Sequence, residues 1–293
     1  MVGMLPLLGS NPSVNLALQG RVFRYIDTAN GSDAARRSGN RAYRTLQAAI
    51  DAGSPGDAFL VAPGQYDETV TIPPALNQIV LIGLGGRGAA FIEPSAEDAG
   101  GMVVNADDVA LHNLGVAGED ATSAVALTVT GARFRATSCK FEGGLTQLAL
   151  GPGTDAQITA GTHGDAGDAL VEDCEFTWGT NGVILKASDY GAVTQARFRR
   201  NLFRNLSAAA FEESGGSVDI RFRDLLIEGN IFAENEGAPP TKYISLNDDN
   251  GNDGLVVGNF FQTALNGGLN LVSTALIWSA NFHPAGLSTG QPS

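Results

Sequence analysis

Ile227-Glu228-Gly229-Asn230-Ile231-Phe232 is the stretch that decides the fold, because its pattern returns along the chain. The pattern is an apolar residue, two variable residues, Asn or Cys, one variable residue and Phe. Four more segments fit it without gaps, and they begin at Ala136, Val171, Phe198 and Val256. The Asn or Cys positions are Cys139, Cys174, Asn201, Asn230 and Asn259, which are 35, 27, 29 and 29 residues apart. The phenylalanines are Phe141, Phe176, Phe203, Phe232 and Phe261.

This repeat has the alternation of short strands joined by a bend. Apolar residues at alternate positions mark strands, and the alternation slips by one residue at the Asn or Cys. Asn tolerates the left-handed backbone of a bend, and its amide can hydrogen-bond to an Asn one coil away. Parallel strands stack about 4.8 Å apart, so we expect one internal stack of phenylalanines. The sequence therefore predicts an all-β fold, a right-handed parallel β-helix solenoid of triangular coils. Weaker matches lie at Asn113 and Asn281.

Cys139 and Cys174 take the Asn position in consecutive coils, and they are the two cysteines of the chain. Two cysteines exclude a disulfide-dense scaffold and a four-cysteine zinc site. The pair is expected as stacked, buried thiols, with a disulfide as the alternative. Equivalent positions of parallel neighbours rarely give good disulfide geometry.

The N-terminal part has a second signature. Residues 45–53 read as an amphipathic helix with Thr45 as N-cap and Gly53 as its stop. A strand at 58–62, a turn at 63–66 and strands at 68–73 and 79–83 follow. A β-helix must cover the edge of its first coil, and a short capping helix does this.

Residues 25–86, with Gly56-Asp57 and Pro63-Gly64-Gln65-Tyr66, resemble the N-terminal part of the pectin-lyase-like superfamily of right-handed β-helix proteins. The Asn-x-Phe coils extend the resemblance to about residue 262. It implies the fold but not the function, since lyases, esterases, hydrolases and inert virion spikes share it.

The expected organisation is an N-terminal arm (1–20), a β-helix (21–283) and a C-terminal tail (284–293). The β-helix includes the capping region 25–86 and a lateral loop at 151–167. Leucines of the arm would be costly to leave in water, so the arm either folds back on the first coil or docks on another protein. These leucines are Leu5, Leu7, Leu8, Leu16 and Leu18.

The known chemistries of the superfamily each have a residue signature, and none is complete in this chain. Gly64-Gln65-Tyr66-Asp67-Glu68 matches a pectin methylesterase motif that is structural in those enzymes. Their catalytic segments, such as Asp-Phe-x-Phe-Gly, are missing. Asp248-Asp249 matches one of four polygalacturonase motifs, and the calcium-binding cluster of pectate lyases is not found. The resemblance therefore favours a protein that is not an enzyme.

Carboxylate pairs could still hydrolyse a glycan. The best candidates for a catalytic pair are Glu212, Asp219, Asp224 and Glu228, with Glu213 beside them. Carboxylates of this kind are more often solvated residues of an outer face. The segment 247–254 fails the EF-hand spacing, the three histidines are isolated, and no phosphate-binding loop exists. No cofactor and no metal site are expected.

The net charge limits which kinds of partner the chain is expected to bind. At −13 the chain is a poor ligand for nucleic acid or anionic membrane. The apolar N-terminus lacks Lys and Arg and is a poor signal peptide.

The superfamily includes β-helices of tailed phages, which fold in the host cytoplasm and leave by lysis. By elimination we therefore expect a non-enzymatic bacteriophage protein on the virion surface, a capsid decoration or spike that docks through its arm. It is expected to be a homotrimer that contacts capsid or tail proteins, with a surface glycan as a further partner. A tailspike-type polysaccharide depolymerase is the alternative, and a non-catalytic carbohydrate-binding module is a third hypothesis.

Overall fold

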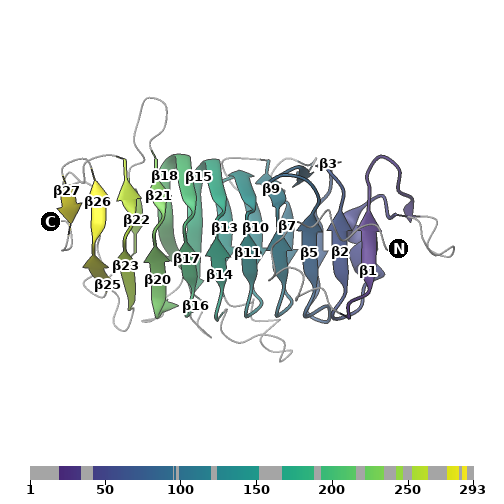
Figure 1. Cartoon of the computed structure of the whole chain (residues 1–293), viewed down its shortest axis with the longest axis horizontal. Coiled ribbons are helices and arrows are strands. Elements are labelled where there is room, and N and C mark those ends of the chain that lie inside the picture. The colour runs from purple at the N-terminus through teal and green to yellow at the C-terminus, as the bar shows by residue number, and fades with distance from the viewer. Residues whose placement is uncertain are drawn as a thin grey trace.

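The computed structural model describes residues 20–33, 42–94, 96, 99–119, 124–151, 167–187, 193–215, 222–233, 242–246, 253–262, 276–283 and 286–288. Its coils lie side by side along one long axis, from β1 near the N-terminus to β27 near the C-terminus (Figure 1). Within these residues every strand pairing in the sheets is parallel except the last, between β26 and β27. The predicted parallel β-helix is confirmed.

Each coil contributes strands to up to three faces. Sheet A contains β1 (Phe23–Ile26), β2 (Ala58–Val61), β5 (Val80–Gly83), β8 (Ala110–His112), β11 (Arg135–Thr137), β14 (Leu170–Glu172), β17 (Arg197–Arg199), β20 (Leu225–Glu228), β23 (Gly254–Val257) and β25 (Leu276–Ser279). Face B contains β3 (Gly64–Tyr66), β6 (Ala90–Ile92), β9 (Leu114–Gly118), β12 (Lys140–Gly143), the first halves of β15 (Glu175–Ala187) and β18 (Leu202–Gly215), β21 (Ile231–Phe232), β24 (Phe260–Phe261), β26 (Asn281–His283) and β27 (Gly286–Ser288).

Face C completes the coil. It contains β4 (Val70–Ile72), β7 (Met102–Val104), β10 (Val125–Val129), β13 (Thr146–Leu150), the second halves of β15 and β18, and β22 (Lys242–Ser245). The long strands β15 and β18 run through both faces, which joins B and C into one sheet. A short pair, β16 (Val193–Thr194) and β19 (Phe222–Arg223), stands apart from them.

The predicted phenylalanine stack forms the centre of the core. Phe176 and Phe203 lie with ring centroids 4.6 Å apart, and Phe232 and Phe261 lie 4.7 Å apart with nearly parallel planes. Phe203 and Phe232 bridge the two pairs at 5.2 Å, and Phe141 begins the stack, 5.0 Å from Phe176. All five rings are buried. Stacked rings one coil apart fix the register of the coils. A shift of one residue along a strand would turn its Phe from the core to the outer face.

The asparagines form the predicted ladder, but one detail of the prediction is wrong. Asn201, Asn230 and Asn259 are buried and bonded to one another, yet they do not take the left-handed backbone. The preceding residue does so, for example Arg200 with φ 54° and Gly229 with φ 63°. The bend therefore needs one left-handed residue, and the Asn after it points inward to bond the backbone.

The ladder continues at Asn281 but not at Asn113. Asn259 donates to Asn281, as the weaker downstream match suggests. Upstream, Lys140 pairs with Gly115, so Leu114 lies opposite Cys139. Asn113 is the left-handed bend residue of its coil, with φ 57°, because Asn is one of the few residues that tolerate that backbone.

Cys139 and Cys174 are free and buried. The expectation of stacked, buried thiols is met, and the alternative of a disulfide is not. The Sγ of Cys174 accepts the backbone N–H of Cys139 at 3.4 Å. Burial raises the pKa of the Cys174 thiol well above its ordinary value, which keeps it protonated.

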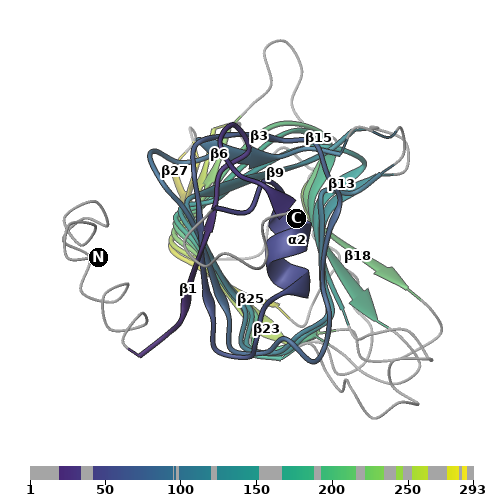
Figure 2. The ribbon, with the colours of Figure 1, turned by 90° about the vertical axis from the view of Figure 1, so that its right-hand side faces the viewer.

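The capping helix α2 (Leu46–Asp51) lies across the N-terminal end of the coil (Figure 2). Thr45 caps it by accepting the N–H of Ala48 at 3.3 Å. Glu68 accepts the N–H groups of Leu46 and Gln47 at 2.7 and 2.9 Å. The predicted turn after strand β2 is itself a strand, β3, because it continues face B.

Some predictions lie outside the described residues. They include the arm 1–19 with its leucines, loop residues 152–166, Asp219, and Asp248-Asp249. Within the expected C-terminal tail, Gly286–Ser288 forms β27, which pairs antiparallel with β26. An antiparallel strand of this kind covers an edge that would otherwise be open to other chains.

Candidate functional site

The described carboxylates that the sequence suggested are not gathered in one place. Asp224 precedes β20 and Glu228 ends it, so their Cα atoms are about 13 Å apart along an extended strand. Glu228 is bonded to Arg199 at 2.7 Å. Glu212 lies on β18 in face C, beside Ile184 of β15. This arrangement gives Asp224, Glu228 and Glu212 no shared catalytic geometry.

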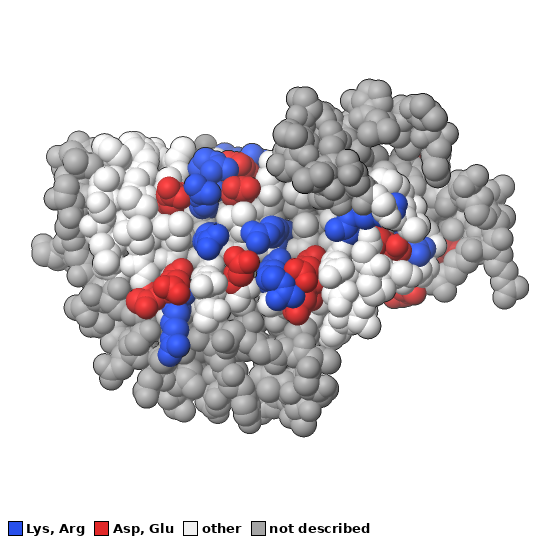
Figure 3. Space-filling model, turned by 60° about the horizontal axis from the view of Figure 1, so that its bottom comes forward, with Lys and Arg blue, Asp and Glu red and all other residues white. Residues whose placement is uncertain are grey.

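The outer face of sheet A is a lattice of ion pairs over the middle coils (Figure 3). Arg135 meets Asp168 at 3.3 Å, and Arg200 contacts both Glu172 and Asp173 at 2.9 Å. These contacts join residues that are one coil apart. Positive and negative groups therefore neutralise each other locally, although the chain is acidic overall.

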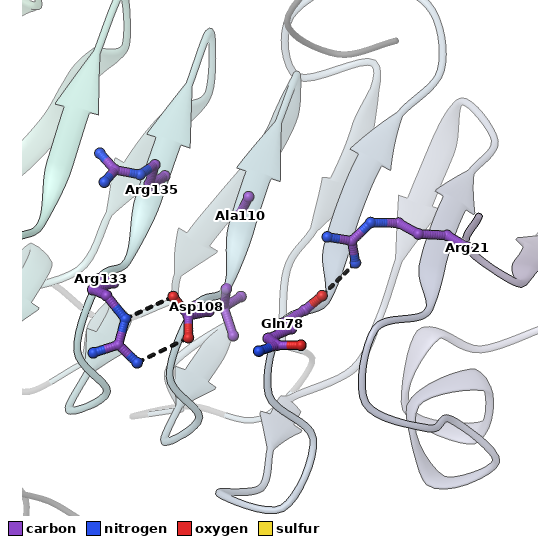
Figure 4. A pocket seen from close by; sticks show the side chains of 7 residues that line it. Arg21, Gln78, Asp108, Ala110, Arg133 and Arg135 are labelled. Carbon is purple, nitrogen blue, oxygen red and sulfur yellow. Dashed lines mark hydrogen bonds and ion pairs between the residues drawn. The ribbon is translucent and has the colours of Figure 1, made fainter. Parts of the chain in front are cut away.

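A shallow depression of about 330 Å³ lies at the N-terminal part of this face (Figure 4). Its polar lining is Arg21, Gln78, Asp108, Arg133 and Arg135. Arg133 grips Asp108 with two hydrogen bonds of 2.7 and 2.8 Å. Hydrogen bonding from Arg133 lowers the pKa of Asp108 below its usual value. Arg21 donates to the backbone carbonyls of Gly56 and Gln78. These guanidinium groups are thus already bonded to other groups of the chain itself.

A different pair of carboxylates comes together on face B. Phe141 and Phe176 point inward, so the residues beside them, Glu142 and Glu175, point outward. Lys140 pairs in register with Glu175, and Glu142 with Thr177. Glu142 and Glu175 are therefore diagonal neighbours on one face, with Cα atoms about 8 Å apart.

Cations surround this pair. Arg204, one coil further on, donates to the Oε1 atom of Glu175 from Nε at 2.9 Å and from Nη2 at 2.5 Å. Arg87 approaches the other oxygen of Glu175 at 3.9 Å. Lys140 bonds Glu142 on the same strand. The face thus carries two carboxylates and three cations within neighbouring coils.

Trp178 stands at the edge of this charged face. It follows Thr177 in β15, is 60 % exposed, and has a φ of 58°. The residues at the same bend in the neighbouring coils, Gly143 and Asn205, also have positive φ. A left-handed backbone costs a bulky residue about 1–2 kcal/mol. An exposed tryptophan held at that cost is a candidate for function.

Beneath Trp178 lies a buried polar contact. Gln147 of β13 donates through Nε2 to the carbonyl of Thr177 at 2.5 Å. The Gln147 Oε1 and Thr177 Oγ1 atoms have no hydrogen-bond partner among the described residues, and both side chains are buried. The contact ties the bend that bears Trp178 to face C.

The sequence analysis missed this face, although its signal was present. The repeat fixes which residues are inward phenylalanines, and the residues on either side of each must point outward. Reading those flanks in consecutive coils gives Lys140 and Glu142, then Glu175, while Thr177, the remaining flank, is buried. In the described part of the chain, no group of three or more His, Cys, Asp or Glu could hold a metal ion. The helix found there is too short to cross a membrane.

The stacked parallel coils define the class: the chain is a right-handed parallel β-helix protein. No protein-family model and no curated protein matches its sequence. Solved structures do match its fold. Pectin methylesterase from carrot is 12% identical with a TM-score of 0.59, and the match covers 89% of this chain and 82% of that one.

Two further structures show the same likeness. A substituted pectin methylesterase in complex with a hexasaccharide is 12% identical with a TM-score of 0.58, over 92% of this chain and 91% of that one. The Escherichia coli protein YbhC is 16% identical with a TM-score of 0.56, over 93% of this chain and 78% of that one. At these identities the likeness concerns the fold, as the resemblance of the sequence implied.

Proposed function

We propose that this chain binds a polysaccharide on the outer face formed by β12, β15 and β18. The observation that carries the proposal is the grouping of Glu142, Glu175 and exposed Trp178 on two consecutive coils. Carboxylates beside an aromatic platform are the combination that we expect of a β-helix that binds or cleaves a polysaccharide.

The chemistry of the face suits sugars. Carboxylates and guanidinium groups make the stronger, charge-assisted hydrogen bonds to hydroxyl groups. The indole of Trp178 offers an apolar surface with an N–H at its edge, which suits the alternating apolar and polar surfaces of a sugar. The face runs across coils instead of closing into a cavity, so it can take a polymer. The hexasaccharide bound to a structure of the same fold supports this class of ligand.

Cleavage of the glycan is a second candidate, because Glu142 and Glu175 lie on one face of consecutive coils. Glycoside hydrolases use two carboxyl groups about 5 to 9.5 Å apart, and side chains whose Cα atoms are about 8 Å apart can reach such a separation. Against cleavage, Arg204 already bonds one carboxylate and Lys140 the other. These contacts occupy oxygens that an acid or a nucleophile would turn toward the glycosidic bond. Binding is therefore the main proposal, and cleavage is the second candidate.

Binding is tested with the full chain on an array of bacterial and plant polysaccharides, followed by calorimetry on the best ligand. Trp178→Ala is expected to weaken binding about tenfold, because one stacking contact is lost. Val22→Ala is the matched control, since Val22 is 61 % exposed against 60 % for Trp178 and lies just before β1 of sheet A. Equal affinity of Trp178→Ala and the parent chain, or no binding to any polysaccharide, would refute the proposal.

Cleavage is tested by the release of reducing ends from the same ligand. If the face is catalytic, Glu142→Gln and Glu175→Gln each abolish release, and Glu228→Gln leaves it unchanged. If the parent chain binds the glycan and releases no reducing ends, the chain is a binding protein.

A place on a bacteriophage virion surface, with docking through residues 1–20, remains a proposal of its own. It rests on the missing catalytic motifs and on the apolar leucines of the arm. A glycan-binding face is compatible with it, since such a particle must recognise a cell surface. Electron microscopy of particles with antibody against this chain tests it, and labelling of no phage particle would contradict it.

A further inference from the structure

A column of apolar side chains lies open to solvent on the C-terminal coils of face B. Ile231, Phe260 and Phe282 follow one another in register on β21, β24 and β26. They are 48 %, 46 % and 49 % exposed. Each points away from the core, because the neighbouring Phe232 and Phe261 point inward. The column therefore contributes nothing to the internal stack.

The uncharged surface continues around the corner onto sheet A. Ile277 of β25 is 67 % exposed, and Leu255 and Val257 of β23 are half-buried on the same side. The strands β21, β23, β24, β25 and β26 contain no Asp, Glu, Lys or Arg. In Figure 3 the coloured charges cover the middle coils, and the described surface toward the C-terminal end is white. Among the described residues of face B, the charged side chains therefore end with Arg204, one coil before the apolar column.

We propose that this C-terminal face, made of Ile231, Phe260, Phe282 and Ile277, is where copies of this chain meet side by side. A contiguous exposed apolar patch of this kind marks an interaction site.

The lack of charge on this face favours a second copy of the chain over other partners. Two chains of net charge −13 repel each other over most of their surfaces, so they can approach closely only where charge is lacking. A charged partner would find no Asp, Glu, Lys or Arg on the strands of this face to pair with. A glycan would need hydrogen-bonding groups, which the column does not offer. A second copy brings an equally uncharged apolar column, and rotational symmetry lets equivalent residues of the copies meet at the symmetry axis.

The direction of the column suits a rotational assembly. Its side chains follow the stacking direction of the coils, parallel to the long axis of the solenoid. Copies packed in parallel around one axis would bring each Phe260 close to its equivalent in the neighbour. This geometry fits the homotrimer that the sequence analysis expects, and it makes the interface apolar at its centre.

Sedimentation velocity of the full chain over a range of concentrations tests the inference. The expected result is an assembly of about three times the 30.3 kDa chain mass. Phe260→Asp is expected to weaken association at least about 30-fold, because it buries an unpaired charge in each copy. Phe23→Asp is the matched control, since Phe23 is likewise 46 % exposed and lies on β1 at the other end of the solenoid. Circular dichroism checks that both variants are folded.

A second variant keeps the test independent of the charge. Phe260→Cys is expected to give a disulfide-linked pair of chains under mild oxidation, since the native cysteines are buried and free. A monomer at every concentration overturns the inference. So does an assembly that survives Phe260→Asp, or a Phe260→Cys chain that stays unlinked. These outcomes do not depend on whether face B binds a glycan.

Discussion

The Oδ1 atom of Asn230 accepts the backbone N–H of Asn201 at 2.8 Å, although 29 residues separate them in the chain. The same oxygen accepts the Nδ2 group of Asn201 at 3.0 Å, and the Nδ2 group of Asn230 reaches the carbonyl of Phe198 at 3.0 Å. Asn259 repeats this arrangement one coil on. The ladder therefore gives the buried N–H of Asn201, at the bend between sheet A and face B, an acceptor from the next coil.

Asn230→Ala is expected to lower the free energy of unfolding by about 1–3 kcal/mol, because it leaves the buried Asn201 N–H without its side-chain acceptor and removes one donor from the Phe198 carbonyl. Urea unfolding followed by circular dichroism measures the change. Gln65→Ala serves as control, since Gln65 is exposed and bonds only the side chain of Glu93. A loss for Asn230→Ala no larger than that of the control would show that the ladder is not a stabilising element.

Cys174→Asn is expected to raise the free energy of unfolding by about 0.5–1.5 kcal/mol. The Cys139 N–H now has only a weak sulfur acceptor at 3.4 Å, and an amide oxygen would extend the ladder by one coil. Cys174→Ala is the matched variant and is expected to be destabilised. Thermal and urea unfolding under reducing conditions measure both. If the two variants lose equal stability, the site does not accept an amide.

Ala280→Gly is expected to stabilise the last coils by about 0.5–1 kcal/mol. Ala280 holds a φ of 53° at the bend where other coils have Gly229 and Gly258. Glycine removes the steric cost of the left-handed backbone, which stabilises the folded state. Part of this gain is offset because glycine also raises the conformational entropy of the unfolded chain. Ala136→Gly, in the ordinary strand β11, is the control and is expected to destabilise. Unfolding midpoints that move in the same direction would contradict this reasoning.

Asp108→Asn is expected to lower stability at neutral pH but not in acid. Arg133 lowers the folded pKa of Asp108, so its contribution is present above the unfolded pKa and is lost as the pH falls through the folded value. Both side chains are partly exposed, so the contribution is about 0.2–1 kcal/mol. Urea unfolding at pH 7 and at about pH 2 measures the difference between the variant and the parent chain. Glu119→Gln, at an exposed carboxylate, is the control. A difference that persists in acid would mean that the ion pair is not its cause.

The sequence by itself determined the solenoid, the Phe stack and most of the Asn ladder. Each coil packs only on its neighbours, so the requirement for an inward Phe and a bonded Asn recurs at every turn and is written in the chain. The capping helix was equally readable, since Thr45 and the apolar spacing of Leu46, Ala49 and Ile50 are local signals.

The tertiary structure alone decided which distant residues share an outer face. Coil lengths vary, so the register across coils is not fixed where the pattern weakens: Leu114, not Asn113, lies opposite Cys139. Glu142 and Glu175 are 33 positions apart, and only the stacking of β12 on β15 makes them neighbours. The close-packed core restricts which residue types fit at inward positions, so these positions can be recognised in the sequence. Outward positions are open to most residues, so their grouping appears only once the coils are stacked.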